Sequence, residues 1–177
     1  MIILKKNILQ MKIMVWKSKI MIIIGIDPGL IKTGWGVIKK VDNQIKYINS
    51  GTIITNSKLP LSERLLNIYS NVDELIKLYK PEHFSIEETF VNNNPLSSLK
   101  LGHARGVAIL AAATNNIPVF EYSPNLIKKT LTGAGKAEKC QMVAMVKYIF
   151  PGITIKTEDE ADSLCIAICH CNHIVKY

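Results

Sequence analysis

Asp27 is a lone carboxylate at the end of an otherwise apolar run, the segment IIIGIDPG that begins at Ile22. The run has the length and the β-branched residues of a buried strand. Taking a carboxylate out of water is costly unless something compensates its charge, and a divalent cation is one such compensation. Asp-Pro-Gly is also favourable turn chemistry, because proline presets φ and glycine accepts a positive φ. Asp27 is therefore a candidate metal ligand or a turn residue, and this segment alone leaves both interpretations open.

A second carboxylate site, Glu87-Glu88, follows another apolar segment. Successive side chains of a strand point to opposite faces, so only one of the two glutamates can face Asp27. The alternation groups Glu87 with Ser85, and Glu88 with Ile86. It slightly favours Glu87 lying off the apolar face, but it does not decide the assignment.

A third group of acids, in the segment EDEAD from Glu158 to Asp162, opens the last predicted helix. Acids in a first helical turn are favoured by the helix dipole, so simple stabilisation of the helix is one interpretation. Asp159 and Asp162 are an i, i+3 pair, however, so both can face the same way. The helix continues with apolar residues, which predicts that it begins against the core.

These three carboxylate sites would all lie at the ends of elements, in a chain of net charge +8. Two divalent metal ions roughly 3.5–4 Å apart can activate water and stabilise the leaving oxygen in phosphodiester hydrolysis. Hard oxygen ligands favour Mg²⁺, for which Mn²⁺ is a possible substitute. The pattern indicates a nuclease with two metal ions in each active site.

The elements that must position these residues alternate along the chain. Strands are expected over 21–27, 34–38, 44–54, 83–88 and 117–121, and helices over 60–79, 95–115, 124–132, 137–150 and 158–174. Ser123 is expected to cap the helix that Pro124 begins. The order β-β-β-α-β-α-β-α-α-α predicts an α/β fold.

The charge is unevenly distributed. Residues 1–20 carry five lysines and no acid, and are expected to be an extension outside a single domain of residues 21–177. Residues 96–150 hold seven basic residues against two acids, which suits a phosphate-backbone ligand. Arg105, in this basic region, is expected to contact DNA. No apolar stretch is long enough to cross a bilayer, and no secretory feature is present, so a cytoplasmic location is expected.

Cysteines and histidines near the end of the chain could suggest a metal site, but their spacing matches no common zinc pattern. Cys165 and Cys169 are an i, i+4 pair on the last predicted helix. They are expected to fill a core stripe as small apolar side chains.

Several long stretches, in the same order, are similar to the RuvC family of bacterial Holliday-junction resolvases, from about Met21 to Asn172. These stretches are GIDPGLIKTGWGVI, FSIEETF, LKLGHARGVAILAA, PVFEYSPNLIKKT, GAGKAEKCQMV and DEADSLCIAICHC. Two departures are His103, where a glutamine is common, and Lys136, which adds a charge to a glycine-rich loop. Neither removes a catalytic group.

The resemblance implies a ribonuclease-H-like fold, with a five-stranded mixed sheet flanked by helices, and a homodimer. The implied activity is Mg²⁺-dependent, symmetric nicking of two like-polarity strands of four-way DNA junctions, which leaves ligatable ends for recombination and repair. The implied partners are the branch-migration proteins RuvA and RuvB. Carried over by position, the catalytic and metal-binding acids are Asp27, Glu87, Asp159 and Asp162, which selects Glu87 over Glu88.

Three further residues match DNA-contacting positions of the family. Phe90 matches an aromatic residue that contacts junction bases, which suits stacking on an unpaired base. Lys128 and Lys139 match basic residues near the scissile phosphate, and are expected to serve both DNA binding and catalysis.

Two other functions remain as alternatives. One is a related ribonuclease-H-like nuclease that acts on RNA or on other branched DNA. The other is a protein that binds junctions without cutting them, although a pure binder gains nothing from carboxylates that face phosphates. A junction-nicking assay with and without Mg²⁺ separates the three.

Overall fold

The computed structural model describes residues 20–89 and 95–174. Strands are β1 (Ile20–Asp27), β2 (Lys32–Val41), β3 (Gln44–Ile54), β4 (His83–Glu87) and β5 (Val119–Tyr122). Helices are α2 (Leu61–Tyr79), α3 (Pro95–Thr114), α4 (Pro124–Thr132), α5 (Lys139–Ile149) and α6 (Glu158–His173). The order of elements is the predicted one, and β1 begins at Ile20, one residue earlier than expected.

The five strands form one mixed sheet in the order β3-β2-β1-β4-β5. β1, β2 and β3 are antiparallel neighbours, whereas β4 pairs in parallel with β1 and β5 in parallel with β4. The central strand β1 is covered on both faces, which explains why its sequence is continuously apolar rather than alternating. The predicted α/β class and mixed sheet are confirmed.

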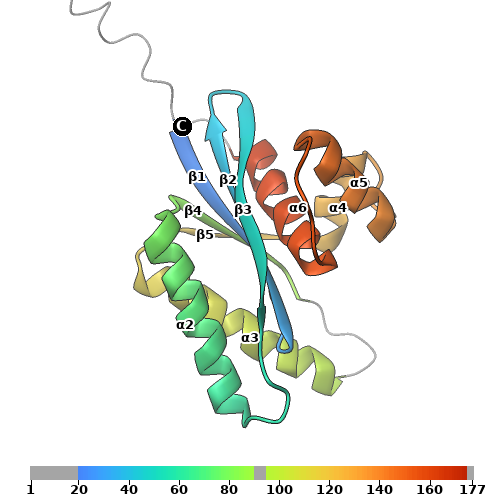
Figure 1. Cartoon of the computed structure of the whole chain (residues 1–177). Helices are drawn as coiled ribbons and strands as arrows, with labels where there is room; N and C mark the ends of the chain where they lie inside the picture. Colours follow the sequence, from blue (N-terminus) through green and yellow to red (C-terminus); the bar gives the residue numbers. More distant parts are fainter. Residues whose placement is uncertain (1–19, 90–94, 175–177) are drawn as a thin grey trace, which may run out of the picture.

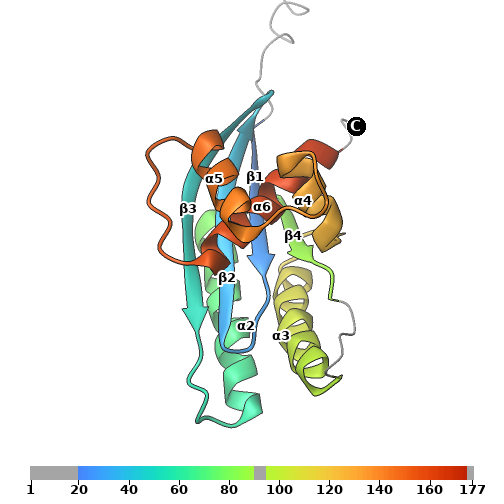
Figure 2. The same cartoon turned by 90° about the vertical axis from the view of Figure 1, so that its right-hand side faces the viewer.

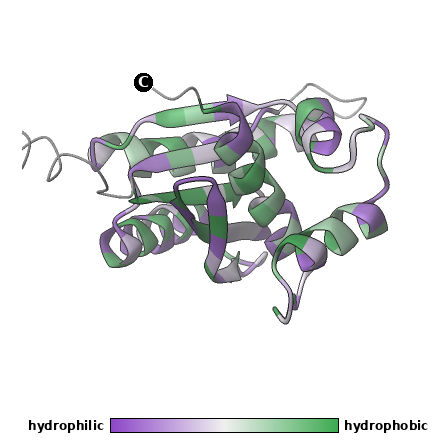
Figure 3. Ribbon diagram, turned by 90° about the horizontal axis from the view of Figure 1, so that it is seen from above, coloured by the Kyte–Doolittle hydropathy of each residue, from purple (hydrophilic) through white to green (hydrophobic). Residues whose placement is uncertain are grey.

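Helices cover the two faces of the sheet differently (Figure 1 and Figure 2). α2 and α3 pack together on one face, and α6 lies directly on the other, against β1 and β2. α4 and α5 pack on α6. In the view from above, apolar residues gather in the central strands between these layers (Figure 3).

Each face of the sheet carries its own apolar core. Ile24, Ile26, Phe84 and Ile86 pack towards α2 and α3. The other core lies around α6 and includes Ile23, Ile38, Leu164, Cys165 and Cys169. Both cysteines are fully buried there, as predicted from their spacing. None of the helices described in residues 20–89 and 95–174 combines the length and apolarity that crossing a bilayer requires.

His170 of α6 is the main polar group inside the second core. Its ring is fully buried, with Nε2 2.8 Å from Nδ1 of His83 and Nδ1 2.7 Å from the hydroxyl of Tyr122. Burial lowers the pKa of His170 to about 4. The neutral ring therefore joins α6 to β4 and β5 through hydrogen bonds, a role that the sequence did not predict for this histidine of the Cys/His-rich segment.

Candidate active site

Asp27 and Glu87 are the last residues of two neighbouring parallel strands. The register pairs Ile26 of β1 with Ile86 of β4, so the next residue of each strand reaches the same edge of the sheet. Side chains alternate between faces along a strand. Gly25 faces α6, and His83 contacts His170 of α6, so Asp27 and Glu87 also point to the α6 face.

The opening of α6 is fixed to the edge strand β3. The side chain of Thr157 caps the helix by accepting a hydrogen bond from the main-chain N–H of Glu160. Its hydroxyl is also 2.7 Å from the hydroxyl of Thr52 on β3. The Glu160 carboxylate is buried and accepts hydrogen bonds from the Ser50 hydroxyl and the main-chain N–H of Lys156. These contacts hold the first turn of α6 over the sheet.

Three glycines let α6 lie directly on the strands. A β-carbon on Gly34 would lie 2.0 Å from the main-chain oxygen of Asp159. On Gly25 it would lie 2.2 Å from the main-chain oxygen of Ser163, and on Gly36 2.8 Å from the side chain of Leu164. At Gly34 and Gly25 the contact is with main chain, so a side chain there would force the helix away, whereas at Gly36 it is with the end of the Leu164 side chain, which can move. The helix backbone therefore reaches the sheet at the edge where β1 and β4 end.

The four acids influence one another electrostatically. Burial raises the pKa of Asp27 to about 8, and the carboxylates of Glu87, Asp162 and Asp159 add to the rise. Burial also raises the pKa of Glu87 to about 7, with a further contribution from Asp162. The pKa of Asp162 is raised by burial as well. The four acids that the sequence singled out are therefore near enough to one another for their charges to interact.

Lys139 and Lys128 lie close enough to oppose this negative charge. The positive charges of both lysines offset part of the rise in the pKa of Glu87 and of Asp162. Lys139 also offsets part of the rise in the pKa of Asp27. The ammonium group of Lys139 is 3.0 Å from a carboxylate oxygen of Glu158 and 3.9 Å from one of Asp162. Both predicted lysines therefore belong to the same site.

Local sequence explains where Lys139 is placed. α4 ends at Gly133, whose φ of 78° lies in the left-handed region that favours glycine. α5 then begins with a reciprocal cap between Glu138 and Gln141. Lys139 is the first residue of α5, so its side chain starts at the end of the helix that faces the opening of α6.

The donor set fits a hard divalent cation. All four acids offer carboxylate oxygens, the ligands that Mg²⁺ and Mn²⁺ prefer. Burial, with the neighbouring carboxylates, raises the pKa values of Asp27, Glu87 and Asp162, and a bound cation would favour their ionised forms. Within residues 20–89 and 95–174, no group of three or more His, Cys, Asp or Glu side chains is drawn together as a preformed metal site. The fit therefore rests on donor chemistry and charge.

Two other predicted residues are not part of this cluster. Arg105 lies on α3, where its Nε donates to the main-chain oxygen of Glu87 and its guanidinium pairs with Glu121. Phe90 lies outside the described residues. The contact of Arg105 with Glu87, like the buried carboxylate of Glu160, was missed by sequence reasoning.

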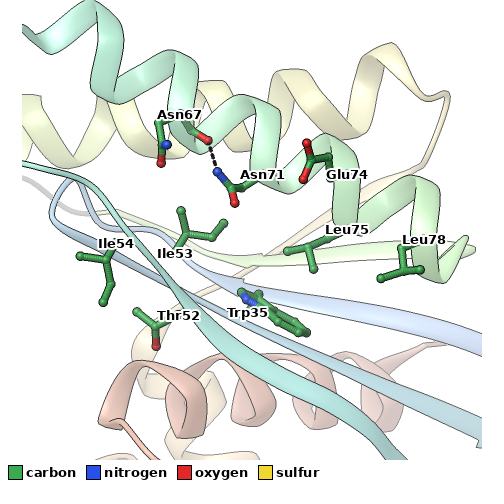
Figure 4. A pocket seen from close by; sticks show the side chains of 9 residues that line it. All are labelled: Trp35, Thr52, Ile53, Ile54, Asn67, Asn71, Glu74, Leu75 and Leu78. Atoms are coloured by element: carbon green, nitrogen blue, oxygen red, sulfur yellow. Dashed lines mark hydrogen bonds between the residues drawn. The ribbon is translucent and has the colours of Figure 1, made fainter.

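A groove elsewhere on the molecule has no connection with these acids. It lies between β2, β3 and α2, and its lining includes Trp35, Ile54, Asn71 and Leu78 (Figure 4). Trp35 packs with the α2 and α3 core, on the face of the sheet opposite to α6. None of the predicted site residues lines this groove.

Known proteins resemble this chain over most of its length. The family model "Crossover junction endodeoxyribonuclease RuvC" matches residues 23–170. Proteins of that name from Azorhizobium caulinodans and Brucella suis biovar 1 are 46% and 44% identical over 151 residues, which is 85% of this chain and 89% and 87% of theirs. The structure of Thermus thermophilus RuvC in complex with a Holliday junction substrate superposes with a TM-score of 0.79 at 30% identity, over 85% of this chain and 93% of that one. The chain therefore belongs to the RuvC family of crossover junction endodeoxyribonucleases.

Proposed function

We propose that this protein resolves Holliday junctions by nicking two strands of like polarity at symmetric positions, which leaves ends that a ligase can join. The observation that carries this proposal is the electrostatic coupling of Asp27 and Glu87, at the ends of parallel strands, with the acids at the opening of α6. Family membership supplies the substrate class, since relatives are crossover junction endodeoxyribonucleases.

In this proposal the four acids hold the catalytic metal, which is Mg²⁺, with two ions per site and Mn²⁺ as a substitute. When bound, such ions activate a water nucleophile and stabilise the leaving oxygen. Lys128 and Lys139 face the same carboxylates and are placed to stabilise negative charge that develops on the scissile phosphate. Because Lys139 also touches Glu158 and Asp162, it holds the acidic cluster together before DNA arrives.

DNA binding is assigned to the basic residues beside this cluster and to Phe90. Lys128 of α4 and Lys139 of α5 interact with the acids, and Lys129 and Lys136 lie near them in the chain, so this region suits the phosphate backbone. Phe90 follows β4 closely in the chain, which supports a stacking contact with an unpaired junction base. Arg105 was predicted to bind DNA, but its side chain is engaged within the protein.

A homodimer is supported by an exposed stripe on α3. Leu96, Leu99, His103, Gly106 and Leu110 follow one another at spacings of three and four residues, the pattern of a helix–helix seam. The three leucines are more than half exposed, and a β-carbon on Gly106 would meet nothing within 4 Å. Exposed leucines at this spacing suit a second copy of the same helix. We further propose, from the family resemblance, RuvA and RuvB as partners and the cytoplasm as the place of action.

A nicking assay tests the proposed function. The wild type, with Mg²⁺, is expected to cut a synthetic four-way DNA junction at symmetric positions and to leave linear duplex and RNA–DNA hybrid intact; a chelator should abolish cutting. Asp27→Asn, Glu87→Gln, Asp159→Asn and Asp162→Asn should each lower the rate more than about 100-fold while junction binding persists. Glu88→Gln is the matched control and should cut normally.

The alternatives predict different results. Preferential cutting of RNA–DNA hybrid would identify a related nuclease with another substrate. Tight junction binding without cutting by the wild type, in Mg²⁺ and in Mn²⁺, would identify a binding protein. Full activity of any one of the four variants would remove that residue from the proposed site.

A further inference from the structure

The peptide group between Glu87 and Glu88 is held at both of its polar ends. Its oxygen accepts a hydrogen bond of 3.1 Å from Nε of Arg105 on α3. Its N–H donates a hydrogen bond of 2.9 Å to the main-chain oxygen of Tyr122 on β5. The two partners come from different elements, so the plane of this one peptide is fixed where β4 ends.

The same arginine is tied to β5. Its guanidinium forms an ion pair with Glu121, the residue immediately before Tyr122. Arg105, Glu121, Tyr122 and the Glu87–Glu88 peptide thus form a closed ring of contacts. Arginine suits this position because its planar fork of N–H donors can serve a carbonyl and a carboxylate at the same time, which a lysine ammonium on a flexible stem does less well.

The ring restrains the main chain from which the Glu87 side chain projects. The bond from the Glu88 N–H to Tyr122 continues the β4–β5 ladder by one peptide past Glu87, and Arg105 holds the opposite end of that peptide. Arg105 lies with α3, on the face of the sheet opposite to α6, so its guanidinium is directed to Glu87 O and Glu121 rather than to the acidic cluster. By holding the carbonyl of Glu87 on that side, it keeps the carboxylate directed to the α6 side, towards Asp27 and Asp162.

We infer that Arg105 is a positioning residue for Glu87: it fixes the last peptide of β4 and does not contact DNA or metal. The inference rests on the proposed function, in which Glu87 is a catalytic acid. It replaces the expectation from the sequence that Arg105 is a phosphate contact. With a side chain that is 21% exposed and two partners inside the protein, Arg105 is a poor candidate for that role.

The test compares Arg105→Gln and Arg105→Lys with Lys100→Gln, which removes one positive charge from an exposed position of the same helix. We expect both Arg105 variants to lower the single-turnover cleavage rate about 10- to 100-fold. Their dissociation constants for the junction should stay within about twofold of that of Lys100→Gln, because a residue that touched a phosphate would weaken junction binding when replaced. Without metal or DNA, the main-chain amides of residues 84–89 should exchange hydrogen faster in both Arg105 variants than in the wild type. The exchange rates of the other strands should be unchanged.

The outcomes are distinguishable. Wild-type cleavage and exchange in Arg105→Lys would show that only the charge matters, and an affinity loss as large as the rate loss would make Arg105 a DNA contact; either result overturns the inference. If Arg105→Gln does not fold, Glu121→Gln, which leaves the Nε contact in place, should still speed exchange of residues 84–89 and slow cleavage, and a wild-type result there also overturns it. Activity in Glu87→Gln would instead refute the proposed catalytic role of Glu87, whatever Arg105 does.

Discussion

Gly34 of β2 and Asp159 of α6 are packed so closely that a β-carbon on Gly34 would lie 2.0 Å from the main-chain oxygen of Asp159. The position of the last helix is therefore set by the absence of a side chain on a strand. Because Asp159 and Asp162 lie on the first two turns of that helix, the same contact determines how near they come to Asp27.

The first prediction is that Gly34→Ala displaces the opening of α6. The added methyl group cannot be accommodated without movement of main chain, so the free energy of unfolding should fall by about 1–3 kcal/mol. The cleavage rate should fall further than the loss of folded protein explains, since two acids move together. Urea unfolding and junction nicking measure the two effects.

Gly135→Ala is the matched control, because its β-carbon would meet its nearest neighbour, the main-chain oxygen of Asn125, at an ordinary 3.7 Å. It should leave stability and cleavage close to wild type. Equal behaviour of Gly34→Ala and Gly135→Ala would mean that α6 is not seated on the strand as described.

The second prediction concerns stability and pH in the presence of a chelator. The pKa of Asp27 is raised from 3.8 to about 8 in the folded chain, so between these values the folded state binds more protons than the unfolded state. Stability is then greatest at low pH and is lost as the pH rises towards 8. His170, with a lowered pKa of about 4 and an ordinary value of 6.5, has the opposite effect, but only below about pH 6.5.

Glu87, whose pKa is raised to about 7, acts in the same direction as Asp27 at the lower end of this range, so between pH 6.5 and 8 metal-free protein should lose roughly 1–2 kcal/mol of unfolding free energy, mostly through Asp27. Asp27→Asn should flatten this slope, and Mg²⁺ should weaken it, because a bound cation favours the ionised carboxylates. Asp42→Asn, at an exposed turn, is the control and should keep the wild-type slope. A wild-type slope in Asp27→Asn would contradict the assignment.

Much of this arrangement could be predicted from the sequence. The element order followed from apolar runs and turn residues, and the capped start of α4 at Ser123 was predicted and is observed. Carboxylates at the ends of apolar strands indicated a site, because a charged residue directly after a run of buried residues needs a compensating partner. The family motif chose Glu87 over Glu88, and the register of β4 explains that choice, since Glu87 shares the α6 face with His83.

What the sequence did not predict depends on partners far apart in the chain. The pairing of Arg105 with Glu121 and the Glu87 carbonyl requires α3 to lie beside β5, which no local pattern specifies. Glu160 had a usable signal, because Thr157 followed three residues later by glutamate is a capping pattern. The observed Glu160 carboxylate instead bonds to Ser50 and Lys156, so even that signal gave only part of its role.

The third prediction is that Lys128→Ala and Lys139→Ala reduce turnover more than junction binding. The positive charge of each lysine partly offsets the raised pKa of Glu87 and Asp162, and the proposed function has both lysines stabilise the scissile phosphate. We expect the cleavage rate to fall about 10- to 100-fold and the junction affinity to fall at most a few-fold. The control is Lys147→Ala, which removes one positive charge from an exposed position of α5. Single-turnover nicking measures the rate and fluorescence binding measures the affinity. Equal losses of rate and affinity would show that both lysines only contact the DNA backbone.

The fourth prediction tests the α3 stripe. Leu110→Glu places a charge on an exposed leucine of the stripe. If the proposed dimer forms through this stripe, the variant should be a monomer by light scattering, with an unchanged melting temperature. The monomer should nick junctions without coupling the two cuts. Leu66→Glu on α2, where the leucine is 63% exposed, is the matched control and should stay dimeric. A dimeric Leu110→Glu would place the interface elsewhere.

The last prediction concerns residues 1–20, which precede the family match at residue 23 and carry five lysines without an acid. A chain that starts at Met21 should melt at the same temperature and nick junctions normally. Among the described residues it lacks only Ile20, which is 47% exposed and pairs with Val41 at the end of the β1–β2 ladder. If the lysines touch DNA, the truncated chain should bind with a shallower salt dependence, since each phosphate contact contributes about −0.9 to the log–log slope on duplex DNA. We expect an unchanged slope, and a truncated chain that aggregates or melts early would show instead that the first twenty residues belong to the domain.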